Sequence, residues 1–122
     1  MILEVLQPRF SVCKISDYSG IDPMQPFCFT GATDEENSLV CPEAFVPENT
    51  TEREDGWRGF RISGQLDFSL IGILARVSEI LASNGIGIFV ISTYNTDYIF
   101  TKEENFQRAL KALKNNEFTI IS

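Results

Sequence analysis

The chain has 122 residues, of which 43% are hydrophobic and 22% are charged, and its formal net charge is −7. These proportions are ordinary for a globular protein, and the length suits one compact unit or two very small units that share a core. No apolar run approaches the roughly 20 residues that a membrane helix requires. Phosphate binding needs a basic face, whereas the basic side chains here are scattered. We therefore expect neither membrane insertion nor a nucleic-acid partner.

The first ten residues lack both a basic start and a small-residue cleavage site, so we expect a cytoplasmic protein. The chain contains three cysteines, Cys13, Cys28 and Cys41, and no histidine. An odd number of cysteines without a CxxC pair argues against a disulfide framework, and a zinc site would need histidine or closely paired cysteines. We expect free thiols in a reducing compartment, no metal and no other cofactor.

The first half alternates short apolar segments with turn residues. Residues 1–9 are expected to form an edge strand or an arm. Glycine and two prolines break residues 17–26, which have room for at most one helical turn. The polar residues 42–55 are expected to be a loop with at most one short helix. Strands are predicted over residues 10–16, 27–33 and 38–41.

The second half has a clear periodicity. Between Ser69 and Asn84, apolar residues recur every three or four positions, which predicts an amphipathic helix. Asp67 or Ser69 is a suitable N-cap, and Asn84-Gly85 stops the helix. A strand follows over residues 86–94, predicted to be central because both of its faces are apolar.

The chain then turns at residues 95–97 into a hairpin partner over residues 98–100. A second helical stripe covers residues 105–115, and residues 117–121 form a closing strand. The resulting order is βαββαβ, an α+β, ferredoxin-like fold in which an antiparallel sheet carries its helices on one face.

The two halves resemble each other weakly. Residues 29–43 match a segment 60 positions later, and residues 14–16 match one 47 positions later. The difference of 13 positions is about the length of one helix. We therefore predict a duplicated fold: a degenerate first copy with a shortened helix over residues 1–56, and a complete copy over residues 57–122.

Residues 67–74 (DFSLIGIL) and 81–88 (LASNGIGI) resemble the ACT domain, a small-molecule regulatory module of amino-acid metabolism. One departure is Ile71, where the family has proline before the loop glycine. Residues 91–99 (ISTYNTDYI) are similar to an ACT subgroup that includes cytosolic arginine sensors and short tandem bacterial and archaeal proteins. The resemblance is strong over half of the chain and faint over residues 10–50.

The residues themselves are suited to an amino acid. Free amides at the helix start, from Ser69 to Gly72, would attract a carboxylate. Asp97 would pair with an ammonium or guanidinium group. Each residue also has a plain structural alternative: helix packing for Gly72, capping for Asp67 and turn stabilisation for Asp97.

The resemblance implies an effector site at the interface between two ACT modules. Carried over residue by residue, and added to Asp67 and Ser69, it comprises Leu70, Ile71, Gly72, Ile91, Ser92, Thr93, Tyr94 and Asp97. The first copy has Thr33 and Asn37 at the matching positions, so it keeps the threonine and loses the charge. This asymmetry predicts one full site per chain.

Two functions remain open. The first is an amino-acid sensor that acts through module interfaces as a homodimer. The second is a ligand-free assembly protein that dimerises through its sheet edges. Catalysis is not expected, because the chain lacks histidine, a GxGxxG loop and a P-loop, and no base accompanies its thiols.

Overall fold

The structure is a computed structural model that describes residues 1–63 and 72–122. The chain forms two compact units. Residues 1–7 and 58–122 make the first, here called the helical unit, and residues 8–57 make the second, here called the strand unit. Strand β5 (Thr50–Ile62) contributes residues to both. No helix in the described ranges is long and apolar enough to cross a membrane.

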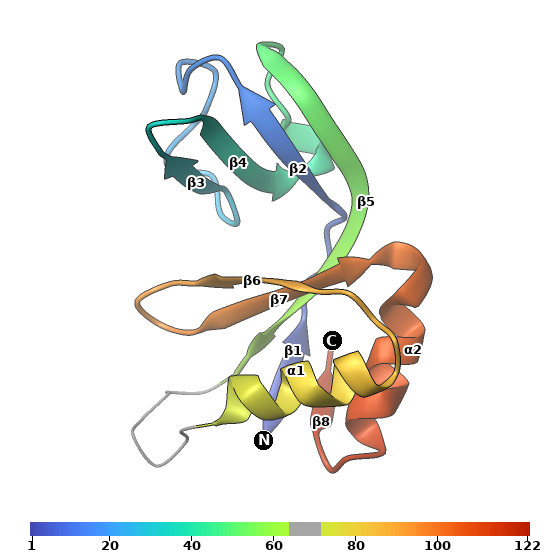
Figure 1. Cartoon of the computed structure of the whole chain (residues 1–122). Coiled ribbons are helices and arrows are strands. Elements are labelled where there is room, and N and C mark those ends of the chain that lie inside the picture. The colour runs from blue at the N-terminus through green and yellow to red at the C-terminus, as the bar shows by residue number, and fades with distance from the viewer. Residues whose placement is uncertain (64–71) are drawn as a thin grey trace. The chain divides into compact units, whose positions relative to one another are not determined.

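In its described residues, the helical unit is a five-stranded sheet with two helices (Figure 1). The strand order is β6-β7-β5-β1-β8. Its elements besides β5 are β1 (Ile2–Val5), α1 (Ile73–Ser83), β6 (Phe89–Ser92), β7 (Asp97–Lys102), α2 (Glu103–Lys114) and β8 (Thr119–Ile121).

One continuous core explains why both helices lie on the same face. Alternate strand residues such as Leu3, Phe60 and Ile99 are fully buried and pack with Val77 of α1 and Leu113 of α2. This arrangement confirms the predicted ferredoxin-like fold with helices on one face. The sheet is mixed, however, and not purely antiparallel, because β1 runs parallel to β8.

The N-terminal segment is not an edge strand or an arm. β1 pairs with β5 on one side and β8 on the other, and Leu3 and Leu6 are 0% and 4% exposed. Residues 1–7 therefore belong with residues 58–122, although the predicted division placed them in the first copy. The pattern of a four-residue strand gives no indication of which distant strand it will join.

Two further strand predictions were wrong. β6 was expected to be central but pairs only with β7 among the described strands. Its apolar side chains are instead half-buried, and Phe89 stacks on Phe100 with ring centroids 4.8 Å apart. Residues 50–55, expected to be loop, begin β5. Their charged side chains are exposed on a sheet edge, where charge is common.

Helix α1 ends where the sequence predicts. Gly85 has a φ of +68°, and the amide of Ile86 donates to the carbonyl of Leu81 at 3.0 Å. The predicted first turn and its proposed caps, Asp67 and Ser69, lie outside the described residues. Helix α2 begins at Glu103, two residues before its predicted start.

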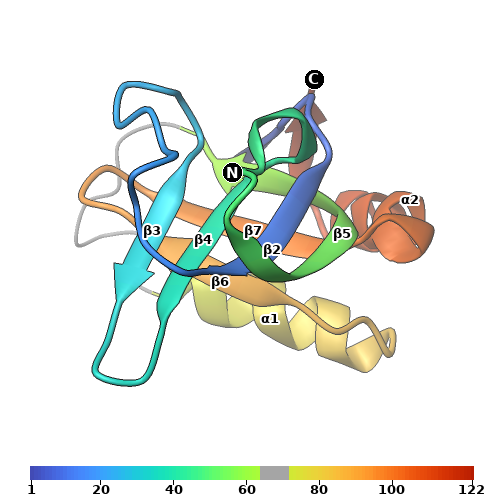
Figure 2. The same ribbon diagram turned by 90° about the horizontal axis from the view of Figure 1, so that it is seen from above.

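The strand unit has the strand order β3-β4-β2-β5, and Figure 2 shows β3, β4 and β2 side by side. These strands are β2 (Phe10–Ile15), β3 (Phe29–Ala32) and β4 (Asn37–Pro42). The two connections hold only one 3-10 turn, η1 (Glu43–Phe45), as their glycine and prolines predict. The core here is small: Cys13, Ile15, Leu39 and Cys41, covered by Tyr18, Ile21 and Val46 from the connections.

Candidate functional site

Gly72 is the N-cap residue of α1, with a φ of +92°, and no heavy atom of residues 1–63 or 72–122 lies within 4 Å of the position a Cβ would take. Its carbonyl accepts from the amide of Arg76 at 2.9 Å. The other predicted members of this loop, Asp67, Ser69, Leu70 and Ile71, lie outside the described residues. The packing alternative for Gly72 finds no partner among the described residues.

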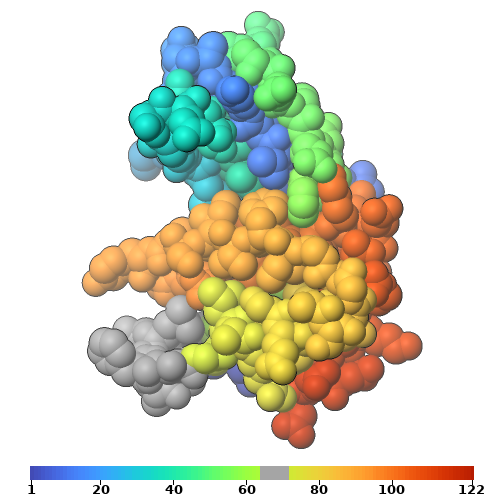
Figure 3. Space-filling model, in the orientation of Figure 1, coloured from blue at the N-terminus to red at the C-terminus, as the bar shows by residue number. Residues whose placement is uncertain are grey.

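The β6–β7 turn carries the remaining predicted site residues. Ile91 and Ser92 end β6, Thr93 and Tyr94 enter the turn, and Asp97 begins β7. The Ser92 hydroxyl donates to Oδ1 of Asp97 at 2.5 Å, so the carboxylate is held beside the strand end. The Tyr94 side chain is fully exposed, and Figure 3 shows the β6–β7 hairpin projecting from the surface.

A buried threonine, which the sequence analysis did not single out, fixes this turn to the strand that leads toward α1. Thr96 is 2% exposed, and its hydroxyl donates to the carbonyl of Ile62, near the end of β5, at 2.7 Å. Its backbone carbonyl accepts from the amide and the hydroxyl of Thr93 at 2.9 and 3.1 Å. In Figure 1 the turn and the start of α1 lie at the same side of the helical unit.

A polar group lies on the sheet face away from the helices. The Arg61 guanidinium forms an ion pair with Glu4 on the neighbouring strand. The hydrogen bond with the Tyr98 hydroxyl makes the largest contribution to raising the pKa of Arg61, and Glu4 raises it further. Arg61 and Glu4 are opposite each other in the antiparallel register, a pairing that could not be predicted without knowing that β1 joins this sheet.

The β3–β4 hairpin of the strand unit has the same construction. Its register, Phe29↔Val40 to Ala32↔Asn37, matches Phe89↔Phe100 to Ser92↔Asp97 of β6–β7 residue for residue, 60 positions later. The amide of Thr33 donates to the carbonyl of Glu36 at 2.9 Å, as Thr93 does to Thr96. Asn37 replaces Asp97, and its amide group donates to the carbonyl of Ser16 at 3.1 Å.

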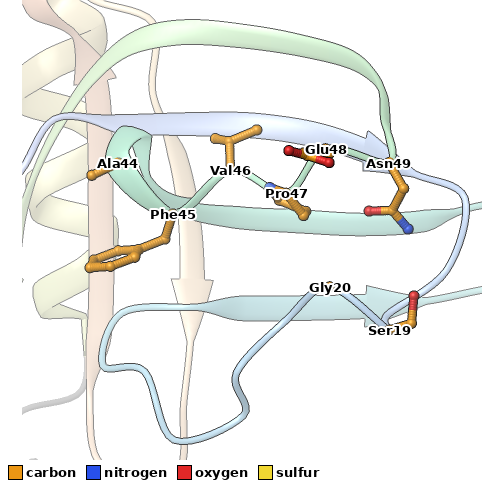
Figure 4. A pocket seen from close by; sticks show the side chains of 8 residues that line it. All are labelled: Ser19, Gly20, Ala44, Phe45, Val46, Pro47, Glu48 and Asn49. Carbon is orange, nitrogen blue, oxygen red and sulfur yellow. The ribbon is translucent and has the colours of Figure 1, made fainter.

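Sequence reasoning missed the pockets of the strand unit. One of them has a volume of about 440 Å³ and lies between residues 19–20 and the loop at residues 44–49 (Figure 4). In it, the amide nitrogen of Asn49 donates to Ser16 and Asp17 at 3.0 to 3.1 Å, and Ser19 also hydrogen-bonds to Asp17. These bonds lower the pKa of Asp17, the Ser19 bonds most strongly. The sequence predicts no long helix in either connection, and this feature could have indicated that space remains beside the sheet.

Solved structures of other proteins share this fold. Protein Atu0741 from Agrobacterium tumefaciens is 27% identical, with a TM-score of 0.84 over 98% of this chain and 91% of its own. VC0802 from Vibrio cholerae, described as a possible transport protein, is 25% identical, with a TM-score of 0.72 over 91% and 85%.

The regulatory subunit of aspartate kinase from Thermus thermophilus is 14% identical and shares the fold alone, with a TM-score of 0.62 over 93% of this chain and 95% of its own. In addition, the family model described as ACT domain matches residues 52–115, more than half of the sequence. This chain belongs to the ACT domain family.

Proposed function

We propose that this chain is a regulatory module that binds an amino acid and has no catalytic activity of its own. Homologues in the ACT family are regulatory amino-acid-binding modules. The observation that carries the proposal is the position of Asp97: a partly exposed carboxylate, held by Ser92, in a turn that Thr96 fixes to the end of β5.

Two kinds of group are needed to hold a zwitterion. The carboxylate of Asp97 would pair with the α-ammonium or a guanidinium group of the ligand. Backbone amides of the predicted loop from Ser69 to Gly72, which leads into α1, would receive the ligand carboxylate, because the dipole at the start of a helix favours an anion. Ile91, Thr93 and Tyr94 would supply the wall of the site.

The site would be completed at an interface. Tyr94 is fully exposed in the single chain, so a ligand at this turn needs a second surface to cover it. We propose that a second module, in a homodimer, provides that surface, and that the ligand shifts the assembly. A coupling of about 1–3 kcal/mol is enough to change the affinity of such an assembly 5–150-fold.

The identical hairpin registers also favour an internal duplication, with the strand unit as the degenerate copy. Asn37 cannot supply the charge that Asp97 does, which supports one full ligand site per chain.

Calorimetric titration of the whole chain with each of the twenty amino acids tests the proposal. The key variant is Asp97→Asn, which removes the charge and places in this turn the residue that the β3–β4 turn already has. Loss of one charge-assisted bond is worth about 1.5–3 kcal/mol, or roughly 10–150-fold in Kd.

Asn37→Asp is the matched control, since it changes charge at the equivalent position of the other hairpin and should leave Kd unchanged. Absence of both binding heat and thermal shift for every amino acid would refute the proposal. So would an Asp97→Asn variant that binds as well as the original chain.

An assembly function without a ligand has one specific observation in its favour. Three exposed apolar residues, Met1, Ile2 and Ile121, are 39%, 43% and 42% exposed and lie on or beside β1 and β8, of which β8 ends the strand order. Exposed edges with apolar side chains favour pairing between copies. In sedimentation, a ligand-independent dimer that Ile121→Lys disrupts would support this alternative, whereas a monomer at high concentration would exclude it.

A further inference from the structure

The three cysteines, which the proposed function does not use, lie together in the strand unit. Cys13 on β2 and Cys41 on β4 are 3% and 0% exposed, and both belong to the small core. Cys28 precedes β3, packs against that core and is partly exposed. All three are free thiols.

Strand register selects one pair among them. β3 and β4 are antiparallel with Phe29 opposite Val40, so one further step places Cys28 opposite Cys41. Directly opposed residues have Cα atoms about 4.5–5.5 Å apart, within the range of about 4.4–6.8 Å that a disulfide requires. Cys13 lies opposite Leu39, which puts it diagonal to Cys41, on the neighbouring strand. Diagonal neighbours are about 7–8 Å apart, which is too far without backbone movement.

From this geometry we infer that Cys28 and Cys41 are a dithiol modification site, which a small disulfide oxidises to a reversible cross-strand disulfide. The site is accessible from one side. Cys28 lines a pocket of about 360 Å³ with Tyr18, Ile21 and Pro23, whereas Cys41 is fully buried behind it. Cys28 therefore reacts first and Cys41 second.

The reaction is two thiol–disulfide exchanges. The Cys28 thiolate attacks one sulfur of the small disulfide, whose S–S bond breaks and releases one thiol carrying the proton that Cys28 lost. The Cys41 thiolate then attacks Sγ of Cys28 and expels the second thiol, which takes the proton of Cys41. The two cysteines lose two electrons and two protons in total, and one small disulfide becomes two thiols.

The surroundings of the thiols set the pH dependence. Burial raises the pKa of Cys28 most, and the negative charge of Asp22 raises it further. Burial, with the neighbouring Cys13 and Cys28, raises the pKa of Cys41 to about 12. Because the thiolate is the nucleophile, the pair should close slowly near neutral pH and faster in alkali, by about tenfold per pH unit below the pKa.

The bridge would act on the pocket as well as on the strands. The connection at residues 17–28 contains no helix, and its side chains pack against this core. Cys28 is its last residue before β3. Joining Cys28 to β4 would fix that end of the connection and remove a thiol from the pocket wall.

The test uses the whole chain with oxidised glutathione, from about pH 7 to about pH 9. After denaturation, free thiols are alkylated and the protein is weighed and peptide-mapped. The expected product has lost two hydrogen atoms, carries one alkyl group on Cys13 and contains a Cys28–Cys41 linked peptide. Reduced glutathione in excess should reverse the change.

Two variants separate the steps. Cys41→Ala should stop at a mixed disulfide between Cys28 and glutathione, and Cys28→Ser should form neither the mixed disulfide nor the bridge. Cys13→Ala is the matched control and should still close, with circular dichroism confirming that each variant is folded. Three alkylated thiols after oxidation, a bridge that includes Cys13, or a bridge between two copies would each overturn the inference.

Discussion

Gly59 is a buried glycine whose side-chain space is already taken. A Cβ at this position would lie 2.8 Å from two ring carbons of Phe100 and 3.3 Å from the carbonyl oxygen of Ile99. The ring cannot move away easily, because Phe100 is 0% exposed and stacks on Phe89. We therefore predict that Gly59→Ala destabilises the helical unit by overpacking its sheet.

The expected cost follows from these distances. Carbon atoms in contact are normally about 3.5–4.0 Å apart, so the ring must move by roughly 0.7–1.2 Å. Overpacking of this kind costs about 1–3 kcal/mol. The lower conformational freedom of alanine in the unfolded chain offsets about 0.4–1 kcal/mol of this cost. Taking the middle of each range, about 2 and about 0.7 kcal/mol, the expected net loss is about 1.3 kcal/mol.

Urea unfolding, monitored by the helical circular dichroism signal, measures the stability of the helical unit, because α1 and α2 both belong to that unit. Gly87→Ala is the matched control, since nothing lies within 4 Å of its Cβ position, and it should be neutral or slightly stabilising. Phe100→Leu, combined with Gly59→Ala, should relieve the clash, so the two changes together should cost less than their sum. If Gly59→Ala unfolds within about 0.5 kcal/mol of the original chain, or if the two changes are additive, the steric reasoning fails.

Three other changes have outcomes set by the structure. Thr96→Val keeps the shape of the side chain but removes its buried bond to Ile62, so urea unfolding should show a loss of about 1–3 kcal/mol; an unchanged midpoint would contradict this. Leu113→Ala, at a 0% exposed position, should cost about 2–5 kcal/mol in the same assay, and a smaller loss would mean that the core closes over the cavity. Ser19→Ala removes the hydroxyl bond, the largest of the contributions that lower the pKa of Asp17, and leaves the bond from the backbone amide of residue 19, so an NMR titration should find that pKa nearer its ordinary 3.8. Because the folded-state pKa is the lower one, this interaction stabilises the fold above the unfolded pKa and is lost as the pH falls through the folded pKa. An unshifted titration would show that Ser19 does not hold the carboxylate.

The candidate site illustrates how far local patterns reach. The Ser92–Asp97 turn could be predicted because its residues are adjacent in sequence and turn chemistry is local. The hydrogen bond from Thr96 to Ile62 could not be predicted in this way, because it joins residues 34 positions apart. The cysteine pair is a similar case: the number and spacing of the cysteines predict free thiols, but only strand register places Cys28 opposite Cys41.

The sequence by itself determined the elements with a strong period, namely both helices of the helical unit, the two hairpins and the class of fold. Hydrophobic periodicity and turn residues act over a few positions, so they survive without knowledge of the partner. Tertiary structure alone decided which strands are neighbours. Among the described strands, β1 lies between β5 and β8 and β6 pairs with β7 alone, and the polar residues 50–55 form the start of β5. Strand pairing depends on contacts between distant segments, and a short segment has the same local pattern whichever partner it finds.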